Sequence, residues 1–151
     1  MRAADMADIG FGPERVIETG LGPHQVNEFI LHIRCAWRVV AEGRILVGSS
    51  DLYFPPLSSD IAADDFDAGT AKRTLRDDLV DALLAHREGP HIVAKVVGSS
   101  TGDLRLEFDD GCALETFASS AQRPDARDEH WRFFQSDSES HFVVAAEGID
   151  E

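Results

Sequence analysis

A run of alternating hydrophobicity constrains the fold more than any other feature of the chain. Within residues 27–40 every second position is apolar, and the positions between them are mostly polar. The apolar members are Phe29, Leu31, Ile33, Cys35, Trp37 and Val39. Successive side chains of a strand point to opposite faces of a sheet. The pattern therefore predicts one long half-buried strand, or two strands joined at a bulge.

Turn residues separate this run from further strand-like segments. Gly43, in the sequence AEGR of residues 41–44, predicts a hairpin turn into a returning strand, ILVG. Asp109-Asp110-Gly111 separates DLRLEF from CALETFA, and Asp-Gly between alternating segments is a strong hairpin signal. EHWRFFQ and HFVVAA, which follow residue 128, predict a last hairpin. Shorter strands are expected at RVIETG, DLYF and HIVAKVV, residues 15–20, 51–54 and 91–97.

Residues 70–88 have the periodicity of a helix. The apolar stripe of this helix is formed by Ala71, Leu75, Leu79, Val80, Leu83 and Leu84. Gly89 suits the left-handed position after a helix end, and Pro90 prevents the helix from continuing. Asp67 or Thr70 is expected to cap the start.

These elements predict an α+β fold. It contains about seven to nine short antiparallel strands, in a strongly curved sheet or a sandwich, with the single helix packed on one face. Residues 1–14 are polar and interrupted by Gly and Pro, and we expect them to form a loose lead-in. Residues 15–151 are expected to form one domain, because a chain of 151 residues can bury enough apolar surface to fold alone.

Charge is distributed unevenly along the chain. The formal net charge is −14, of which residues 51–151 contribute −13 (22 acids and nine bases) and residues 1–50 contribute −1. A negative field repels nucleic-acid phosphates and anionic lipids, so neither nucleic acid nor membrane is an expected partner. The same field would attract a basic protein. The alternative is that the acidic surface serves only solubility.

Location follows from what the sequence lacks. No apolar run approaches the roughly 20 residues of a membrane span, and the first residues lack the apolar core of a signal peptide. These features predict a cytoplasmic protein. Its two cysteines, Cys35 and Cys112, lie in strand-like segments, and we expect both to be buried free thiols.

Residues 98–102, Gly-Ser-Ser-Thr-Gly, match the G-x-S-x-G pattern around the nucleophile of many serine hydrolases. In those enzymes the serine occupies a turn from a strand into a helix. Here the residues after Gly102 alternate leucine with charge, which is the period of a strand. We therefore expect Ser100 to lie in a hairpin turn. Without it the sequence offers no catalytic constellation, which favours a protein that is not an enzyme.

Six histidines raise the question of a metal site. None has a histidine or cysteine at the short spacing that places two ligands on one face, so neither a metal nor a cofactor is expected. The best polar cluster lies in the last hairpin, where His130 and His141 fall on adjacent strands and could face each other. Its candidate binding residues are Glu129, His130, Trp131, Arg132 and His141. An exposed aromatic ring beside Arg132 is typical of a protein-binding patch, and burial on both faces of the sheet is the alternative.

Adjacent aspartates occur in the acidic, irregular connection of residues 57–68. Asp64 and Asp65 are the central pair. Neighbours in sequence point apart on a strand and lie about 100° apart on a helix, so such a pair does not by itself form a catalytic carboxylate site. Both are candidate contacts for a basic partner.

The run GDLRLEFDDGCALETF, residues 102–117, is followed by DEHWRFF, residues 128–134. Together with LVDALLAH and ILHIRCAWRVVAEGRILVG, these runs resemble a family of small uncharacterised bacterial proteins that is frequent in actinobacteria. The resemblance covers residues 26–146. It implies that the last two segments are the family's single helix and opening hairpin. It implies no activity and no functional residue.

Two hypotheses of function result. The first is a non-enzymatic protein-binding domain, of the immunity type or otherwise neutralising its partner, whose acidic surface covers a basic protein. The second is a small-molecule binder or enzyme with a pocket in the curved sheet, lined by Glu129, His130, Arg132 and His141. An unprotected edge strand could also pair two copies into a homodimer.

Overall fold

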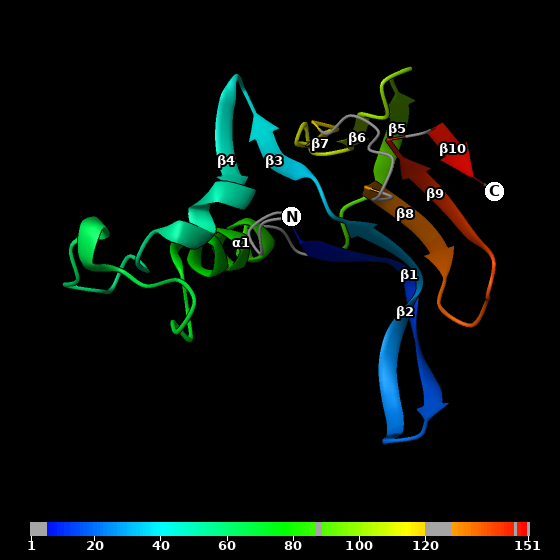
Figure 1. The fold of residues 1–151 in the computed structure, drawn as a ribbon, viewed down its shortest axis with the longest axis horizontal. Helices are drawn as coiled ribbons and strands as arrows, with labels where there is room; N and C mark the ends of the chain where they lie inside the picture. The colour runs from blue at the N-terminus through cyan, green and yellow to red at the C-terminus, as the bar shows by residue number, and fades with distance from the viewer. Residues whose placement is uncertain (1–5, 87–88, 120–127, 147, 151) are drawn as a thin grey trace.

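The computed structural model describes residues 6–86, 89–119, 128–146 and 148–150. These residues form ten strands, one α-helix and two 3-10 helices. The strands build two antiparallel five-stranded sheets that face each other across one apolar core, with the helix beside them (Figure 1). The α+β class is confirmed, in the two-sheet form and with slightly more strands than expected.

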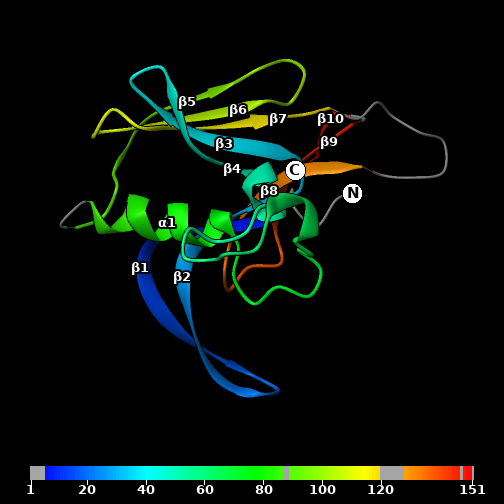
Figure 2. The same ribbon diagram turned by 90° about the vertical axis from the view of Figure 1, so that its left-hand side faces the viewer.

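Sheet A has the strand order β1-β2-β8-β9-β10. Its members are β1 (Ala7–Thr19), β2 (Gly22–Ile33), β8 (Glu129–Gln135), β9 (His141–Ala145) and β10 (Gly148–Asp150). Only Phe29 to Ile33 of β2 pair with β8, so the outer halves of β1 and β2 pair with each other alone. They extend from the molecule as a two-stranded ribbon (Figures 1 and 2). Leu21, at its tip, is 93% exposed.

Sheet B has the strand order β4-β3-β7-β6-β5. Its members are β3 (Ala36–Ala41), β4 (Arg44–Gly48), β5 (Val93–Gly98), β6 (Leu104–Phe108) and β7 (Ala113–Phe117). The expected hairpin turns join these strands. Glu42 and Gly43 both have positive φ in the turn between β3 and β4, and Gly111 has φ +85° in the turn between β6 and β7.

The alternating run of residues 27–40 passes from one sheet to the other. It is divided between β2 and β3 at Arg34 and Cys35, where the chain leaves sheet A and enters sheet B. The alternation continues through the crossing, so Leu31 and Ile33 of sheet A are buried with Trp37 of sheet B in the same core. The second alternative of the sequence analysis, two strands, is confirmed.

Between β4 and β5 the chain forms the irregular connection and the helix. Its elements are η2 (Ser49–Tyr53), η3 (Ala63–Asp65) and α1 (Leu75–Ala85). Helix α1 lies beneath sheet B and beside the start of β1 (Figure 2). Leu79, Val80 and Leu83 of its apolar stripe pack partly buried against the core.

Two expectations about this part of the fold are wrong. Residues 7–14 are not a loose lead-in, because they pair with β2 as the first half of β1, with a bulge between Phe11 and Glu14. Residues 51–54 are not a strand, because Asp51 accepts a hydrogen bond from the Gly48 amide (2.8 Å) and closes the 3-10 helix η2. The strand expected at residues 15–20 is confirmed as the second half of β1, which ends at Thr19.

The helix also begins later than expected. Thr74, rather than Asp67 or Thr70, is its N-cap, and the amide of Thr74 donates to Asp77 Oδ2 at 2.8 Å. Asp67 instead closes a turn of its own by accepting hydrogen bonds from the Gly69 amide (2.9 Å) and Thr70 Oγ1 (3.0 Å). The structure describes the end of the helix only as far as His86, because residues 87 and 88 lie outside the described residues.

Candidate functional site

A bulge in β8 determines how the residues of the predicted cluster are arranged. Glu129 pairs with Ala145 of β9. Trp131 lies two residues further along β8, but its partner Val144 is only one residue away from Ala145. Residues three apart on a regular strand point to opposite faces. Because the bulge adds one residue to β8, Glu129 and Arg132 share the outer face of sheet A.

Glu129 holds Arg132 in a two-pronged ion pair. Arg132 Nε donates to Glu129 Oε1 at 2.7 Å and Nη2 donates to Oε2 at 2.5 Å. The hydrogen bonds from Glu129 raise the pKa of the Arg132 guanidinium. Arg34, from the crossing between the sheets, lies with Nη1 3.8 Å from Glu129 Oε2. The carboxylate is 12% exposed, so the two arginines share a partly desolvated counterion.

His141 completes this polar surface. Its ring stacks on Phe134 at a centroid distance of 4.5 Å, and its Nδ1 lies 3.4 Å from Arg132 Nη1. His32, which pairs with Arg132 across the sheet, contacts the carboxylate of Asp8 on β1. Sequence reasoning missed Arg34, His32 and Asp8, because their contacts depend on the pairing of β1, β2 and β8. The charged groups of this surface are bound to each other, which is the arrangement of a structural network.

His130 and Trp131 are not surface residues, so of the two alternatives left open for Trp131 the exposed aromatic patch does not apply. Trp131 is 8% exposed and packs on Phe142 in the core, and His130 is 3% exposed. The alternative, burial on both faces of the sheet, applies to these positions. His130 lies beside the turn at Gly102, whereas His141 lies on the outer face, so the two histidines do not face each other.

The turn that contains Ser100 joins β5 to β6, and a strand follows Gly102 directly. The hairpin interpretation is confirmed. Ser99 organises the turn, since its hydroxyl accepts from the amides of Thr101 (3.3 Å) and Asp103 (3.0 Å). Asp103 accepts from the Ala118 amide at 2.8 Å and from the hydroxyls of Ser99 and Thr101. These hydrogen bonds, with that of Ala118 the strongest, lower the pKa of Asp103.

The same turn joins the two sheets. Gly102 has φ +91°, and its carbonyl accepts a hydrogen bond of 2.8 Å from Trp131 Nε1. A Cβ at Gly102 would lie 2.9 Å from Val144 Cγ1, so β9 packs directly on the glycine backbone. Glycine is required here both for the backbone conformation and for the close approach of sheet A.

Asp64 and Asp65 lie in η3, on a second surface far from the β8 cluster (Figure 1). We call residues 53–67 the acidic segment. Residues 51–71 contain five aspartates and no lysine, arginine or histidine. Within the described part of the chain, no cation forms an ion pair with Asp60, Asp64 or Asp65, and all three are exposed.

The acidic segment also exposes large apolar side chains. Tyr53 is 42% exposed, Phe54 45%, Ile61 53% and Leu57 76%. Sequence reasoning missed these four residues, since DLYF was interpreted as a strand and Leu57 and Ile61 carry no periodic signal. They adjoin the free aspartates on the same segment.

The segment is fixed to helix α1 near its first residues. The amide of Leu75 donates to the Phe54 carbonyl at 2.9 Å, and the amide of Leu57 donates to Asp78 Oδ2 at 2.7 Å. The hydrogen bond from Arg73, followed by that from the Leu57 amide, lowers the pKa of Asp78. Asp78 therefore stays ionised and continues to hold the segment on helix α1.

Neither cysteine forms a disulfide. Cys35 is buried as expected, whereas Cys112 is only partly buried. Burial and the nearby Asp110 raise the pKa of the Cys112 thiol, which keeps it protonated and a poor nucleophile.

In residues 6–86, 89–119 and 128–146, no three histidine, cysteine or acidic side chains are placed to hold a metal ion. Within the described residues, no helix has the length and apolarity needed to span a bilayer.

Comparison with known proteins gave no match to a family model, to a curated protein or to a solved structure. The resemblance of residues 26–146 to a family of small actinobacterial proteins therefore stays a prediction.

Proposed function

We propose that the protein is a non-enzymatic binding domain that docks a basic partner protein on the acidic segment. The observation that carries this proposal is the combination, on one segment, of free aspartates with exposed large apolar side chains. In one version the bound partner is neutralised, as an immunity protein neutralises a toxin.

The composition of the segment supports a protein partner rather than a simple ion. Protein interfaces combine an apolar centre, which supplies most of the binding free energy, with a polar rim. Tyr53, Phe54 and Leu57 can supply such a centre, and Asp60 and Asp64 such a rim. A simple cation would gain nothing from the apolar side chains.

The charge of the molecule supports a basic partner. With a net charge of −14, the protein attracts cationic proteins at long range and accelerates their encounter. Positive charges on the β8 surface are already neutralised by Glu129, whereas the carboxylates of the acidic segment are not paired within the described residues. A cationic surface therefore gains most at the acidic segment.

The test compares two triple variants with equal net charge. In the first, Asp60→Asn, Asp64→Asn and Asp65→Asn remove three charges from the segment. In the control, Glu18→Gln, Glu42→Gln and Glu139→Gln remove three charges from other exposed positions. Each protein is immobilised and exposed to host extract at about 0.1 M and about 1 M salt, since screening is far stronger at the higher concentration.

We expect wild type and the control to retain the same basic protein at low salt and to release it at high salt. The segment variant should retain at least tenfold less of this protein than wild type and the control do. Retention of the partner by the segment variant at the level of the control would overturn the proposed site.

A further inference from the structure

Strand β1 lies at one edge of sheet A, and its outer half projects from the molecule. It pairs with β2 on one side, and no strand among the described residues pairs with its other side. The first half of this edge lies beside helix α1, since Ala7 to Phe11 of β1 and Val80 and Leu83 of the helix line a common cavity of about 770 Å³. The second half has no helix beside it, and residues 14–27 extend as a ribbon away from the core (Figures 1 and 2).

The ribbon is held in shape by contacts of its own. Its cross-strand pairs follow one another without a bulge as far as Thr19 and Gly22 at the tip, where Thr19 Oγ1 donates to the Gly22 carbonyl at 2.8 Å. At its base, Arg15 pairs with Glu28 of β2 and with Asp137 of the loop between β8 and β9. The outer half of β1 is therefore a preformed, regular strand edge.

An edge of this kind favours pairing with a further strand. A two-stranded hairpin is marginally stable in water, and additional strands stabilise it. The backbone N–H and C=O groups of an edge are a template for such pairing, which proteins commonly prevent with bulges, lysines, prolines or very short strands. Residues 14–20 contain no bulge, no lysine and no proline, and Val16 among them is 69% exposed.

The other described sheet edges have features that hinder pairing. Strand β5 has a bulge between Val93 and Lys95, and the lysine belongs to the edge strand itself. Strand β4 contacts helix α1, and its pairing with β3 is interrupted by a bulge at Val39 and Val40. Strand β10 has only three residues. Among the described strands, β1 therefore has the longest regular edge that is open to another strand.

The charge distribution favours a second copy of the chain as the source of the added strand. Two copies repel each other through a net charge of −14 each, so they approach most easily where the local charge is smallest. The ribbon contains two acids and one base, a net charge of −1, whereas residues 51–151 carry −13. The ribbon is thus a part of the surface on which two copies can meet with little repulsion.

Symmetry and charge together select one register for this pairing. In a two-fold dimer of antiparallel strands, one residue lies opposite itself, and residues at equal distances on either side of it lie opposite each other. With Arg15 or Glu18 at the centre, that residue would face its own like charge, and with Val16 at the centre Glu14 would face Glu18, which destabilises the pair. With Ile17 at the centre no like charges face each other, and Val16 lies opposite Glu18.

The length of the edge selects the same register. Its regular part begins at Glu14, after the bulge, and ends at Gly20, where the turn of the ribbon starts. Ile17 is the middle residue of this stretch. A register centred on Ile17 therefore pairs the stretch over its full length.

We propose that the protein forms a homodimer in which the outer halves of β1 from two copies pair antiparallel about Ile17. The two copies of sheet A then become one continuous sheet, with the ribbons at its centre. This interface does not include the acidic segment, so it does not depend on the proposed basic partner.

Sedimentation velocity of the purified full-length protein, over a range of concentrations, tests the dimer. We expect wild type to dimerise reversibly. Val16→Glu places like charges opposite each other at both Glu18 positions and should raise the dissociation constant at least tenfold. The control Leu21→Glu adds the same charge at the exposed tip, outside the paired stretch, and should leave the dissociation constant nearly unchanged. A monomer at every concentration, or equal weakening by the two variants, would overturn the interface.

A charge exchange tests which residues face each other. Adding Glu18→Lys to Val16→Glu converts both facing pairs into Glu–Lys pairs, and should restore the dissociation constant to within threefold of wild type. The control combines Val16→Glu with Glu42→Lys, which makes the same change of net charge at an exposed position far from the ribbon, and should stay weak. Equal dissociation constants for the two double variants would refute the register.

Cysteine cross-linking identifies the residue at the two-fold axis. Directly opposite residues have Cα atoms about 4.5–5.5 Å apart, within reach of a disulfide, whereas diagonal neighbours lie about 7–8 Å apart. Ile17→Cys should therefore form an intermolecular disulfide on oxidation, and Val16→Cys should not. Wild type gives the background, since its Cys35 is buried and its Cys112 partly buried. Equal yields from the two variants, or a disulfide from Val16→Cys alone, would contradict the register.

Salt dependence distinguishes this dimer from binding driven by opposite charges. Raising the salt concentration from about 0.1 M to about 0.5 M screens the repulsion between two chains of net charge −14, so the wild-type dimer should become at least twofold tighter. Binding of a basic protein to the acidic segment should weaken under the same change. A dimer that weakens with salt would be held by opposite charges, which would contradict the proposal.

Discussion

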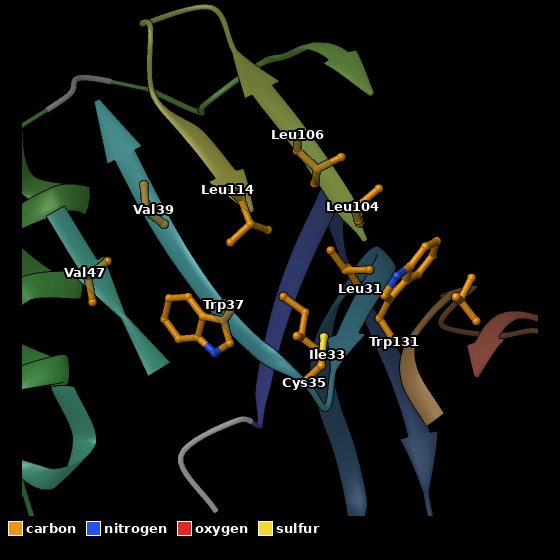
Figure 3. Packing of buried hydrophobic residues seen from close by; sticks show 11 residues of the cluster. Leu31, Ile33, Cys35, Trp37, Val39, Val47, Leu104, Leu106, Leu114 and Trp131 are labelled. Carbon is orange, nitrogen blue, oxygen red and sulfur yellow. The ribbon is translucent and has the colours of Figure 1, made fainter. Parts of the chain in front are cut away.

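Trp131 and Trp37 lie at opposite ends of one core, and their indole nitrogens have different surroundings (Figure 3). Trp131, from sheet A, donates its hydrogen bond to the carbonyl of Gly102 in sheet B at 2.8 Å. Trp37, from sheet B, has a buried Nε1 with no acceptor. At one end of the core the hydrogen bond from Trp131 to Gly102 joins the two sheets. At the other end the Trp37 indole forms no such bond.

The cavities beside the two tryptophans differ in the polarity of their walls. Trp131 lines a cavity of about 380 Å³ whose other lining residues, among them Leu31 and Leu106, are all apolar. Trp37 lines the larger cavity, whose wall also contains Arg76 and His91. Apolar surface alone does not distinguish these two places. Arg76 and His91 do, since the wall of the smaller cavity contains no charged or polar side chain.

The largest effect is expected from Gly102→Ala, which disrupts the contact between the two sheets at Gly102 and Trp131. The new Cβ would meet Val144 Cγ1 at 2.9 Å, and alanine would be strained at φ +91°. Strain and overpacking together should lower the free energy of unfolding by about 3 kcal/mol, as measured by urea denaturation.

Gly111→Ala is the matched control for this variant. Gly111 has φ +85°, but a Cβ added there would have no neighbouring atom within 4 Å. Only the backbone strain applies, so the loss should be about 1 kcal/mol. Equal losses of unfolding free energy in the two variants would show that Val144 moves aside at no cost. The sheets would then not be tightly joined at Gly102.

A smaller effect is expected when the indole groups are exchanged for phenyl groups. Trp131→Phe removes the donor to Gly102 and leaves its carbonyl without that partner, so the free energy of unfolding should fall by about 2 kcal/mol. Trp37→Phe removes a donor that has no partner, which offsets part of the lost packing. Its loss should be about 1 kcal/mol smaller than that of Trp131→Phe. Urea denaturation of both variants checks the difference, and a larger loss for Trp37→Phe would contradict the comparison.

The smallest effect concerns Asp103, in the same turn as Gly102, and the pH dependence of its contribution to stability. Hydrogen bonds from the Ala118 amide, Ser99 and Thr101 lower the pKa of Asp103 in the folded state. The carboxylate therefore stabilises the protein at neutral pH, and this contribution is lost as the pH falls from about 5 through the folded pKa. Asp103→Asn should cost about 1 kcal/mol at pH 7 and progressively less in acid.

Thermal unfolding of wild type and Asp103→Asn between pH 7 and pH 2 measures this convergence. Asp78 and Asp110 also have a lowered pKa, but both proteins contain them, so the difference between the two curves isolates Asp103. Parallel curves over the whole range would show that the Asp103 carboxylate does not hold the turn.

The sequence predicted the elements whose signals are local. The turn at Asp109-Asp110-Gly111 and the strands beside it need only alternation and a glycine with positive φ, and both are visible in the residues themselves. The hairpin interpretation of Ser100 rested on the same kind of signal. Helix α1 was found for the same reason. Its N-cap was not, because Thr74 is held by a hydrogen bond to Asp77 while Asp67 closes a separate turn.

The candidate site was predicted less well, because it depends on distant pairings. Whether Glu129 and Arg132 share a face is decided by the bulge opposite β9, and strict alternation places them on opposite faces. The burial of Trp131 depends on the Gly102 turn, 29 residues earlier in the chain. Residues 7–14 pair with β2 despite their glycine and proline, because the bulge between Phe11 and Glu14 accommodates both.

The two hydrogen bonds that fix the acidic segment to helix α1 have a thermodynamic consequence. Leu57 is held by Asp78 of the helix, and Phe54 by the amide of Leu75 at the helix start, while Val80 and Leu83 of the same helix line the cavity. A partner that shifts the segment must break these two hydrogen bonds, and their free energy is then lost from the free energy of binding.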